Sequence, residues 1–237
     1  IIPICRHDAE QLLPSKRINV VYNFIDFGQF DDRIDGGGIR KELGIAADAP
    51  VALMLGGMNP IKGTAVFVAA AVRVLQERPD AIFLIAGPMV ETNFRNRISR
   101  RIVYQNCVLA GIPEQFQSSL RFLGVRNDIP ALLAASDVLC FPSTVPHFAR
   151  PIIEASAMGV PVVASDLGGP QELVRHDETG LLLPPEDHEA LAGALLRLFA
   201  DPAARLRLGS AGKERARKEF AADINTKRII ALYEKIF

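Results

Sequence analysis

The chain has 237 residues, of which 49% are hydrophobic and 23% are charged, so it can bury a substantial core within one large domain. Its 27 basic residues balance its 27 acidic residues. A net charge of zero, with no basic run interleaved with aromatic side chains, gives no indication of nucleic-acid binding.

The cysteines and the hydropathy pattern limit the possible cellular locations of the protein. Cys5, Cys107 and Cys140 are too few and too widely spaced for a disulfide framework or a zinc site. No apolar run reaches the roughly 18 to 20 residues of a membrane span, and no signal peptide opens the sequence. We therefore expect a cytoplasmic protein. Because the sequence starts at Ile1 rather than Met, we also expect a fragment of a longer one.

The first 50 residues carry few signals of regular structure. Residues 1–18 are polar and weakly patterned, and Val20 and Val21 predict the end of a strand. Asn23, Asp26 and Gly28 then predict a turn. A linker rich in glycine and aspartate follows.

A strand, a helix and a second strand come next. Continuous apolar runs predict buried strands at residues 51–55 and 81–86, and an amphipathic pattern predicts a helix at residues 64–77. This spacing favours a right-handed parallel crossover, so the turn GGMNPIKG at residues 56–63 lies where open α/β sheets bind ligands. The turn lacks the Gly-x-Gly-x-x-Gly pattern of dinucleotide sites. Lys62 is either a point charge for a diphosphate or a solvated surface lysine.

The middle of the chain predicts a helix, a strand and a short helix. Residues 91–110 form the first helix, which carries four clustered arginines, Arg95, Arg97, Arg100 and Arg101. Such a cluster could meet an anionic membrane surface, although a solvated helix face is the interpretation we favour. Residues 120–123 are the strand, and Asp128 is expected to cap the helix at residues 129–135.

The stretch at residues 138–164 carries the strongest signals for a binding site. Short apolar strands are predicted at residues 138–141 and 161–164, with a helix at residues 151–158 between them. Pro151 suits the first helical position and Gly159 the left-handed residue after the helix. The free amides and the positive end of this helix make an anion site. Glu154, just inside it, either binds the ribose diol of a nucleotide or only complements the helix dipole.

The last part of the chain completes an α/β pattern. Gly168 and Gly169 either bring amides close to a phosphate or sugar or form a plain turn. Glu172 is expected to begin a helix, and residues 179–183 to form the last strand. Helices follow at residues 187–199, 202–219 and 224–237, with Pro202 at the first position of the second. We predict a Rossmann-like, doubly wound parallel sheet of about six strands in the order 3-2-1-4-5-6.

A family resemblance rests on the block FPSTVPHFARPIIEASAMGVPVVASDLGGPQELV and the later ETGLLLPP. From about residue 20 onward, the chain closely resembles the nucleotide-binding C-terminal half of retaining GT-B glycosyltransferases, the group 1 family with a Glu-x7-Glu motif. The second glutamate of that motif, which binds ribose hydroxyls, matches Glu154. The first, which contacts the donor sugar, falls at Pro146, so half of the motif is absent. By the same resemblance, Lys62 is the phosphate-binding lysine and our predicted catalytic residue.

A second departure concerns the charges around the diphosphate. The family commonly places an arginine five residues before the lysine, and here that residue is Gly57. A charge-assisted hydrogen bond contributes about 1.5 to 3 kcal/mol, so its loss would cost about one to two decades in binding or rate. Arg150 is our hypothesis for a substitute cation.

The resemblance also predicts the remaining residues of the donor site. Val125 and Arg126 would border the nucleobase. The complete set expected to bind the donor is Gly56, Gly57, Val125, Arg126, His147, Phe148, Ala149, Arg150, Glu154, Gly168 and Gly169. We expect no metal ion, because no Asp-x-Asp motif or carboxylate cluster follows a strand. We also expect no cofactor beside the substrate, a nucleotide sugar that we expect to be linked to UDP or GDP.

The resemblance finally divides the chain and suggests its activity. Residues 1–26 would be a remnant of the N-terminal domain and the interdomain hinge, residues 27–220 the nucleotide-sugar-binding domain, and residues 221–237 a helix packing toward the N-terminal domain. We expect a fragment of a retaining glycosyltransferase of the hexosyltransferase type, inactive alone because the acceptor site for a carbohydrate or a lipid-linked molecule is missing. Peripheral contact with the inner membrane face is part of this expectation. The alternative is a nucleotide or nucleotide-sugar binding module that has lost transfer activity. Another GT-B activity, such as a phosphorylase or epimerase, is disfavoured by residues 151–183.

Overall fold

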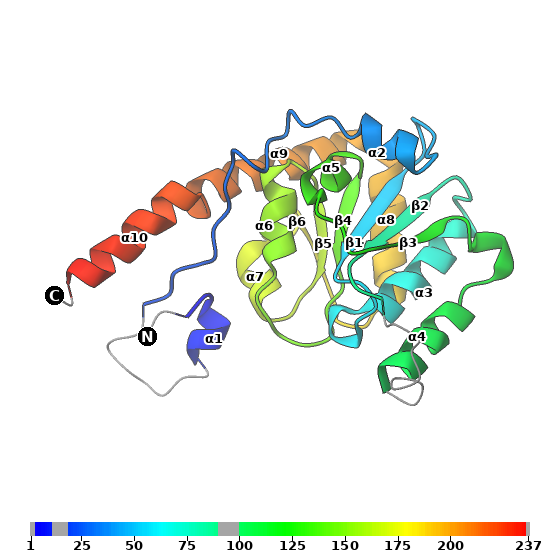
Figure 1. The fold of residues 1–237 in the computed structure, drawn as a ribbon, viewed down its shortest axis with the longest axis horizontal. Coiled ribbons are helices and arrows are strands. Elements are labelled where there is room, and N and C mark those ends of the chain that lie inside the picture. Colours follow the sequence, from blue (N-terminus) through cyan, green and yellow to red (C-terminus); the bar gives the residue numbers. More distant parts are fainter. Residues whose placement is uncertain (1–2, 11–18, 90–99, 236–237) are drawn as a thin grey trace.

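The computed structural model describes residues 3–10, 19–89 and 100–235. Its centre is one six-stranded parallel sheet in the order β3-β2-β1-β4-β5-β6, as the sequence predicted (Figure 1). The strands are β1 (Val51–Leu55), β2 (Ile82–Ala86), β3 (Leu120–Gly124), β4 (Val138–Phe141), β5 (Val162–Ser165) and β6 (Gly180–Leu183). The order reverses between β1 and β4, the position at which ligands bind in such sheets.

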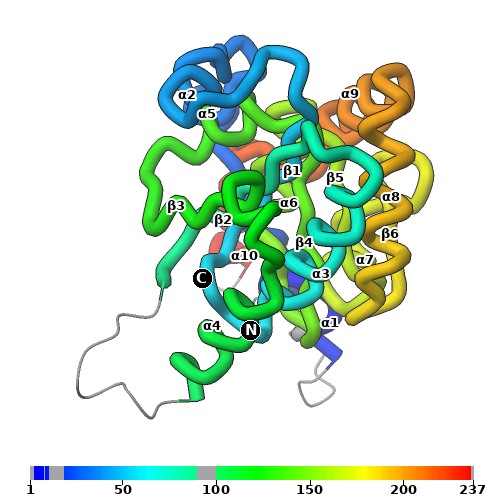
Figure 2. Tube along the Cα trace, turned by 90° about the vertical axis from the view of Figure 1, so that its right-hand side faces the viewer, coloured from blue at the N-terminus to red at the C-terminus, as the bar shows by residue number. Residues whose placement is uncertain are grey.

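Helices cover both faces of the sheet, which is why its strands are continuously apolar. Within the described residues they are α1 (Arg6–Glu10), α2 (Gly37–Glu42), α3 (Thr64–Leu75), α4 (Arg100–Ala110), α5 (Ile129–Ala134), α6 (Arg150–Ala157), α7 (Gly169–Leu173), α8 (His188–Ala200), α9 (Pro202–Glu219) and α10 (Ala222–Glu234), with short 3₁₀ turns η1 (Pro60–Lys62) and η2 (Glu114–Phe116). Helices α3 and α8 lie side by side (Figure 2). No helix of the described residues combines the length and apolarity needed to cross a membrane.

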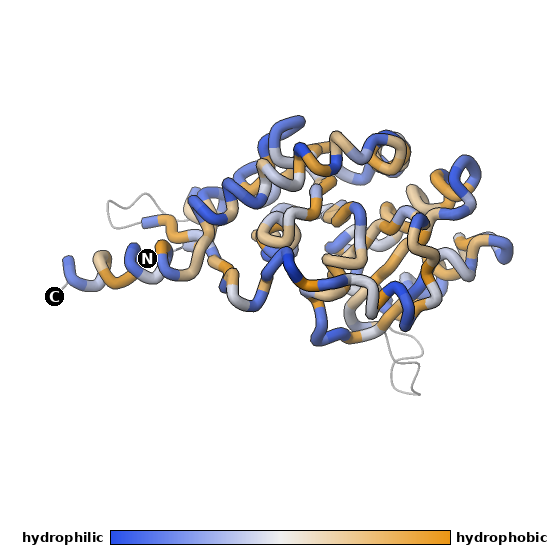
Figure 3. Tube along the Cα trace, turned by 90° about the horizontal axis from the view of Figure 1, so that it is seen from above, coloured by the Kyte–Doolittle hydropathy of each residue, from blue (hydrophilic) through white to orange (hydrophobic). Residues whose placement is uncertain are grey.

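The core consists of two apolar layers, one on each side of the sheet. Leu53 of β1 contributes to the layer under α5 and α6, whereas its neighbour Met54 contributes to the layer under α3 and α8. Side chains of a strand alternate between faces, so each strand supplies both layers. Viewed from above, apolar segments concentrate around the sheet, while α10 mixes polar and apolar residues (Figure 3).

Several predicted boundaries differ from the observed ones. Val20 and Val21 belong to no strand; the chain there is extended, and Ile25 makes a single parallel bridge with Ala221. Helix α7 begins at Gly169 rather than Glu172, because Pro170 fits the first turn and Gly168 takes a positive φ of 60° before it. Helix α10 runs from Ala222 to Glu234, with Lys235 as its C-cap, so it begins two residues earlier than predicted and ends before residue 237. Residues 236–237 lie outside the described residues.

Two further differences concern helix starts. The predicted helix at residues 91–110 is described only from Arg100, so Arg95 and Arg97 lie outside the described residues. Asp128 precedes α5 but makes no side-chain cap, because its carboxylate binds Arg126 instead. Residues 6–10, for which no element was predicted, form α1.

Candidate functional site

A cavity of about 300 Å³ opens at the carboxyl edge of the sheet, beside the reversal of strand order. The ends of β1, β2 and β3 and the first turns of α5 and α6 form its walls. It is lined by Leu55, Gly56, Lys62, Ala86, Gly87, Pro88, Val125, Arg126, Ile129, Pro151 and Glu154. Five of the predicted site residues therefore meet here, namely Gly56, Lys62, Val125, Arg126 and Glu154.

The turn after β1 is shaped by close backbone packing. Gly57 has a φ of +64°, and a Cβ built on it would lie 2.3 Å from the carbonyl oxygen of Pro88. The backbone of Gly87 is equally close, at 2.6 Å. A side chain therefore does not fit this backbone at position 57, where the family resemblance would place an arginine.

Gly87 and Pro88 are wall residues that the sequence analysis did not single out. They follow β2 directly, and Gly87 has a φ of +137°. The signal that could have found them is a Gly-Pro pair immediately after a buried strand, at the same sheet edge as residues 56–63. Two such turns in contact form the floor of the cavity.

Lys62 is a half-buried cation that faces no carboxylate within the described residues. Its Nζ lies 2.7 Å from Nε2 of His147 and 5.4 Å from the ring centre of Phe141. Burial lowers the pKa of Lys62 below that of an ordinary lysine. A desolvated ammonium group without a counter-charge favours binding of an anion.

Glu154 is the buried carboxylate of the cavity. Its side chain is 12% exposed, and one oxygen lies 3.0 Å from Nε of Arg150, whose side chain is 62% exposed. Burial raises the pKa of Glu154, and the charge of Arg150 opposes that rise. The carboxylate is thus held by a partner that can move into solvent.

Arg126 is already neutralised by two carboxylates. Its guanidinium lies 2.7 Å from Glu42 and 2.9 Å from Asp128, and these bonds hold its pKa above the usual range. The side chain therefore offers little free charge to a ligand. Val125, beside it, is 72% exposed at the rim.

The other predicted residues lie near the cavity but do not line it. Residues 142–149 pack against the start of α7. A Cβ on Gly168 would lie 2.7 Å from Pro146, and one on Gly169 would lie 2.6 Å from the carbonyl oxygen of His147. The two glycines thus permit close packing of this loop. Ala149 is fully buried, and Phe148 packs against the core.

The start of α6 leaves its backbone donors available. The residue before the helix is Ala149, so no side chain caps it, and Pro151 occupies the first turn. The helix starts at Arg150, one residue earlier than predicted, and Gly159 follows it with a φ of +72°, as predicted. Pro151 has no N–H and the amide of Ile152 donates to the carbonyl oxygen of Ala149 at 3.0 Å, so the remaining first-turn amides and the positive helix end make the anion site, beside the cavity edge formed by Pro151 and Glu154.

Comparison with known proteins identifies relatives of this arrangement. The model of the family described as glycosyl transferases group 1 matches residues 37–215. The chain is 28% identical over 228 residues to N-acetyl-alpha-D-glucosaminyl L-malate synthase of Bacillus anthracis, covering 96% of this chain and 55% of that protein. It is 31% identical over 222 residues to the lipopolysaccharide core biosynthesis mannosyltransferase LpsB of Rhizobium meliloti (strain 1021), covering 92% and 60% respectively.

A solved structure gives the same result for the fold. Anabaena Alr3699/HepE in complex with UDP and glucose has a TM-score of 0.83 and 25% identity, with 98% of this chain and 62% of that one covered. The chain thus spans between 55% and 62% of the length of these three proteins. The predicted α/β Rossmann-like fold and the predicted family are confirmed.

Proposed function

Because this chain belongs to the glycosyl transferases group 1 family, we propose that it binds the nucleotide-sugar donor of a retaining glycosyltransferase of the hexosyltransferase type. One observation carries the proposal. The cavity at the reversal of strand order holds a desolvated cation, Lys62, and a buried carboxylate, Glu154. A nucleoside diphosphate presents the matching groups, an anion and a ribose diol.

The diphosphate would bind between Lys62 and the first turn of α6. The ammonium group supplies a point charge with three donors, and the uncapped helix start supplies amides and the positive end of its dipole. Gly56 and Gly57 let the backbone approach the same place without side chains. Gly168 and Gly169, with residues 147–149, would close the other side.

The ribose would bind Glu154. An ionised carboxylate only accepts hydrogen bonds, and a diol supplies two donors. The guanidinium of Arg150 lies 3.0 Å from one oxygen of Glu154, and it would yield that oxygen to the ribose. Its exposed position lets it do so.

The base would lie over the rim at Val125 and Arg126, where backbone groups read its edge because the Arg126 guanidinium is engaged. We favour UDP or GDP as the carrier, and the UDP held by the Anabaena protein supports the first. We propose no metal ion and no further cofactor. The described residues hold no group of three or more metal-ligating side chains.

The proposed chemistry is transfer of the sugar to an acceptor, with the enzyme acting mainly by positioning and by stabilising the departing diphosphate. Lys62 would supply that stabilisation. The acceptor, a carbohydrate or a lipid-linked molecule, would bind the part of the longer relatives that this chain does not span. We therefore propose that the chain alone is inactive, and that the full protein works in the cytoplasm, at times beside the inner membrane face.

Two observations favour a second candidate, a binding module without transfer activity. Position 57 has no room for the family's arginine, and Pro146 stands where the family has its first glutamate. Both changes would weaken contacts to the leaving group or the sugar and spare the ribose contact. Transfer of sugar by the full-length protein would exclude this candidate.

The proposal is tested by calorimetric titration of UDP, GDP, ADP and their sugar conjugates into this chain. We expect one nucleotide to bind best and Glu154→Ala to weaken it about tenfold or more. Glu214→Ala is the matched control, because Glu214 is an exposed carboxylate on α9 that pairs with Lys218. Failure of every nucleotide to bind would contradict the proposal.

A further inference from the structure

His147 contacts Lys62 from the loop between β4 and α6. Its Nε2 lies 2.7 Å from Nζ of Lys62, and its Nδ1 lies 2.9 Å from the carbonyl oxygen of Val145. The imidazole ring also packs on Phe141, with ring centres 5.3 Å apart. His147 does not line the cavity, whereas Lys62 does.

These two contacts define the tautomer of the imidazole. A carbonyl oxygen only accepts hydrogen bonds, so Nδ1 of His147 must carry a proton and donate to Val145. An ammonium group only donates, so Nε2 must present its lone pair to Lys62. The ring is therefore neutral, with its proton on Nδ1.

The reverse arrangement, a charged imidazole beside a neutral amine, is disfavoured. The ordinary pKa of a lysine lies about four units above that of a histidine. Burial lowers the pKa of Lys62, but from an ordinary value well above that of a histidine. The proton therefore stays on Lys62.

The loop of His147 is fixed to the segment that carries Lys62. The backbone N–H of Thr144 donates to the carbonyl oxygen of Ile61 at 3.1 Å, and its hydroxyl donates to that of Pro60 at 3.1 Å. On its other side the loop rests on Gly169, where a Cβ would collide with the His147 carbonyl oxygen. The imidazole is thus held at a fixed place relative to η1.

We propose that His147, as the neutral Nδ1–H tautomer, is a positioning residue that holds the ammonium group of Lys62 ready for the diphosphate. This inference rests on the proposed function. The imidazole uses one of the three N–H donors of Lys62 and leaves two for phosphate oxygens. A neutral acceptor orients the cation and leaves its charge intact, whereas a carboxylate in the same place would cancel that charge.

The first test reads the tautomer directly. Nitrogen-15 NMR of histidine-labelled, nucleotide-free chain is recorded about two pH units above the ordinary histidine pKa of about 6.5. The chain has four histidines, and the His147→Gln variant assigns the resonance in question. We expect a proton on Nδ1 and a bare Nε2 whose shift changes in Lys62→Ala. A proton on Nε2 would overturn the proposal.

The second test reads the effect on binding. His147→Leu removes the acceptor, and we expect the affinity for the best nucleoside diphosphate to fall about three- to tenfold, while the nucleoside alone binds as before. His147→Gln restores an acceptor oxygen and should recover part of the loss. His188→Leu is the control, because His188 lies half exposed at the start of α8.

The outcomes separate the two proposals. If Lys62→Ala and Glu154→Ala weaken binding and His147→Leu does not, the positioning role is wrong and the donor site stands. Equal losses for diphosphate and nucleoside in His147→Leu would mean a purely structural role and would also overturn it. If Lys62→Ala and Glu154→Ala leave binding unchanged, the proposed function itself fails.

Discussion

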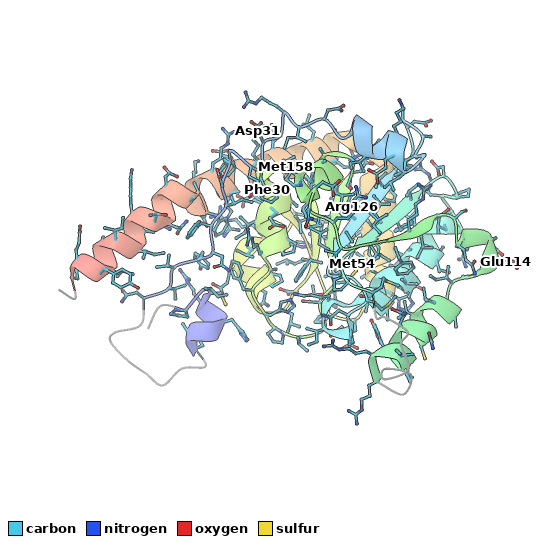
Figure 4. All side chains as sticks on the ribbon, in the orientation of Figure 1. Phe30, Asp31, Met54, Glu114, Arg126 and Met158 are labelled. Atoms are coloured by element: carbon cyan, nitrogen blue, oxygen red, sulfur yellow. The ribbon has the colours of Figure 1, made fainter. Side chains whose placement is uncertain are left out.

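Two cavities lie at opposite ends of α6, and the larger is not the one at the carboxyl edge of the sheet. The opposite cavity measures about 480 Å³, against about 300 Å³ at the proposed donor site. It is lined by Asp32, Met158, Gly159, Leu206, Ser210, Lys213, Glu214 and Arg217. Met158 lies there beside Phe30 and Asp31, near the end of α6 (Figure 4).

The ends differ in whether their charges are satisfied. In the larger cavity Lys213 pairs with Asp32, Glu214 pairs with Lys218, and Arg217 stacks on Phe27. In the smaller one Lys62 contacts the imidazole of His147 and the ring of Phe141, and it makes no ion pair with a carboxylate of the described residues. If the proposed function holds, a desolvated charge without a counter-charge marks the ligand site here better than volume does. Four predictions test it.

The largest expected effect comes from glycines with positive φ at the two ends. Gly57→Ala should lower the free energy of unfolding by about 2 to 5 kcal/mol, because left-handed strain adds to a collision with the turn after β2. Gly159→Ala should cost about 1 to 2 kcal/mol, because the φ is similar but the nearest atom, on Lys213, is 3.9 Å away. Urea denaturation of both variants measures this. Equal losses of unfolding free energy in the two variants would mean that the turns after β1 and β2 move apart easily to accommodate the new Cβ.

The next prediction compares one lysine from each end. Lys62→Ala should weaken the binding of a nucleoside diphosphate about 10- to 100-fold, since a charge-assisted hydrogen bond contributes about 1.5 to 3 kcal/mol. Lys213→Ala removes an equal charge whose carboxylate partner is present, so it should leave binding unchanged. Calorimetry at one ionic strength checks both. Similar losses of affinity in the two variants would mean that the ligand responds to the overall charge of the chain rather than to a contact with Lys62.

The third prediction concerns pH. Burial raises the pKa of Glu154, so the carboxylate takes up a proton at a higher pH than an ordinary glutamate. A charged acceptor binds the ribose diol more strongly than a protonated one. Affinity should therefore be full above the raised pKa and fall by about tenfold as the pH drops through it.

The matched variant for this prediction is Glu154→Gln. It cannot titrate, so its affinity should be lower and should keep only the pH dependence of the nucleotide phosphate itself. Calorimetric titrations of both proteins across the acidic range give the difference. Parallel pH profiles would show that Glu154 does not contact the ligand.

The sequence predicted the frame of the site but not its pairings. The strands and the turns between them follow from local patterns, because apolar runs and small-residue turns act over a few neighbouring residues. The strand order came from the fold class, and the roles of Lys62 and Glu154 came from the family resemblance. The bond from Arg126 to Glu42 joins residues 84 positions apart. No local pattern encodes such a contact. The missing cap at Asp128 has a nearer cause, because its carboxylate binds Arg126 two residues before it.

The N-terminal segment illustrates the same limit. The backbone amides of Arg6 and His7 donate to Glu172, and the hydroxyl of Tyr22 donates to the same carboxylate. Burial, with this bond, raises the pKa of Tyr22 to about 12. Residues 3–10 lack any strong pattern of their own, so the helix they form depends on a partner more than 160 residues away.

The smallest expected effect belongs to Arg150, and it decides between two roles. Because its side chain is 62% exposed, Arg150→Ala should change the free energy of unfolding by about 0.5 kcal/mol or less.

Arg150 opposes the rise in the pKa of Glu154, so its removal should move the midpoint of ligand binding to higher pH. If Arg150 acts only as the ion-pair partner of Glu154, Arg150→Ala should leave the affinity for the diphosphate unchanged above that midpoint. A cation that replaces the arginine missing at Gly57 would instead weaken it about tenfold at every pH. Because Arg150 already pairs with Glu154, we expect the affinity for the diphosphate to stay unchanged. Arg217→Ala, in the opposite cavity, is the control, and it should change neither the midpoint pH nor the affinity.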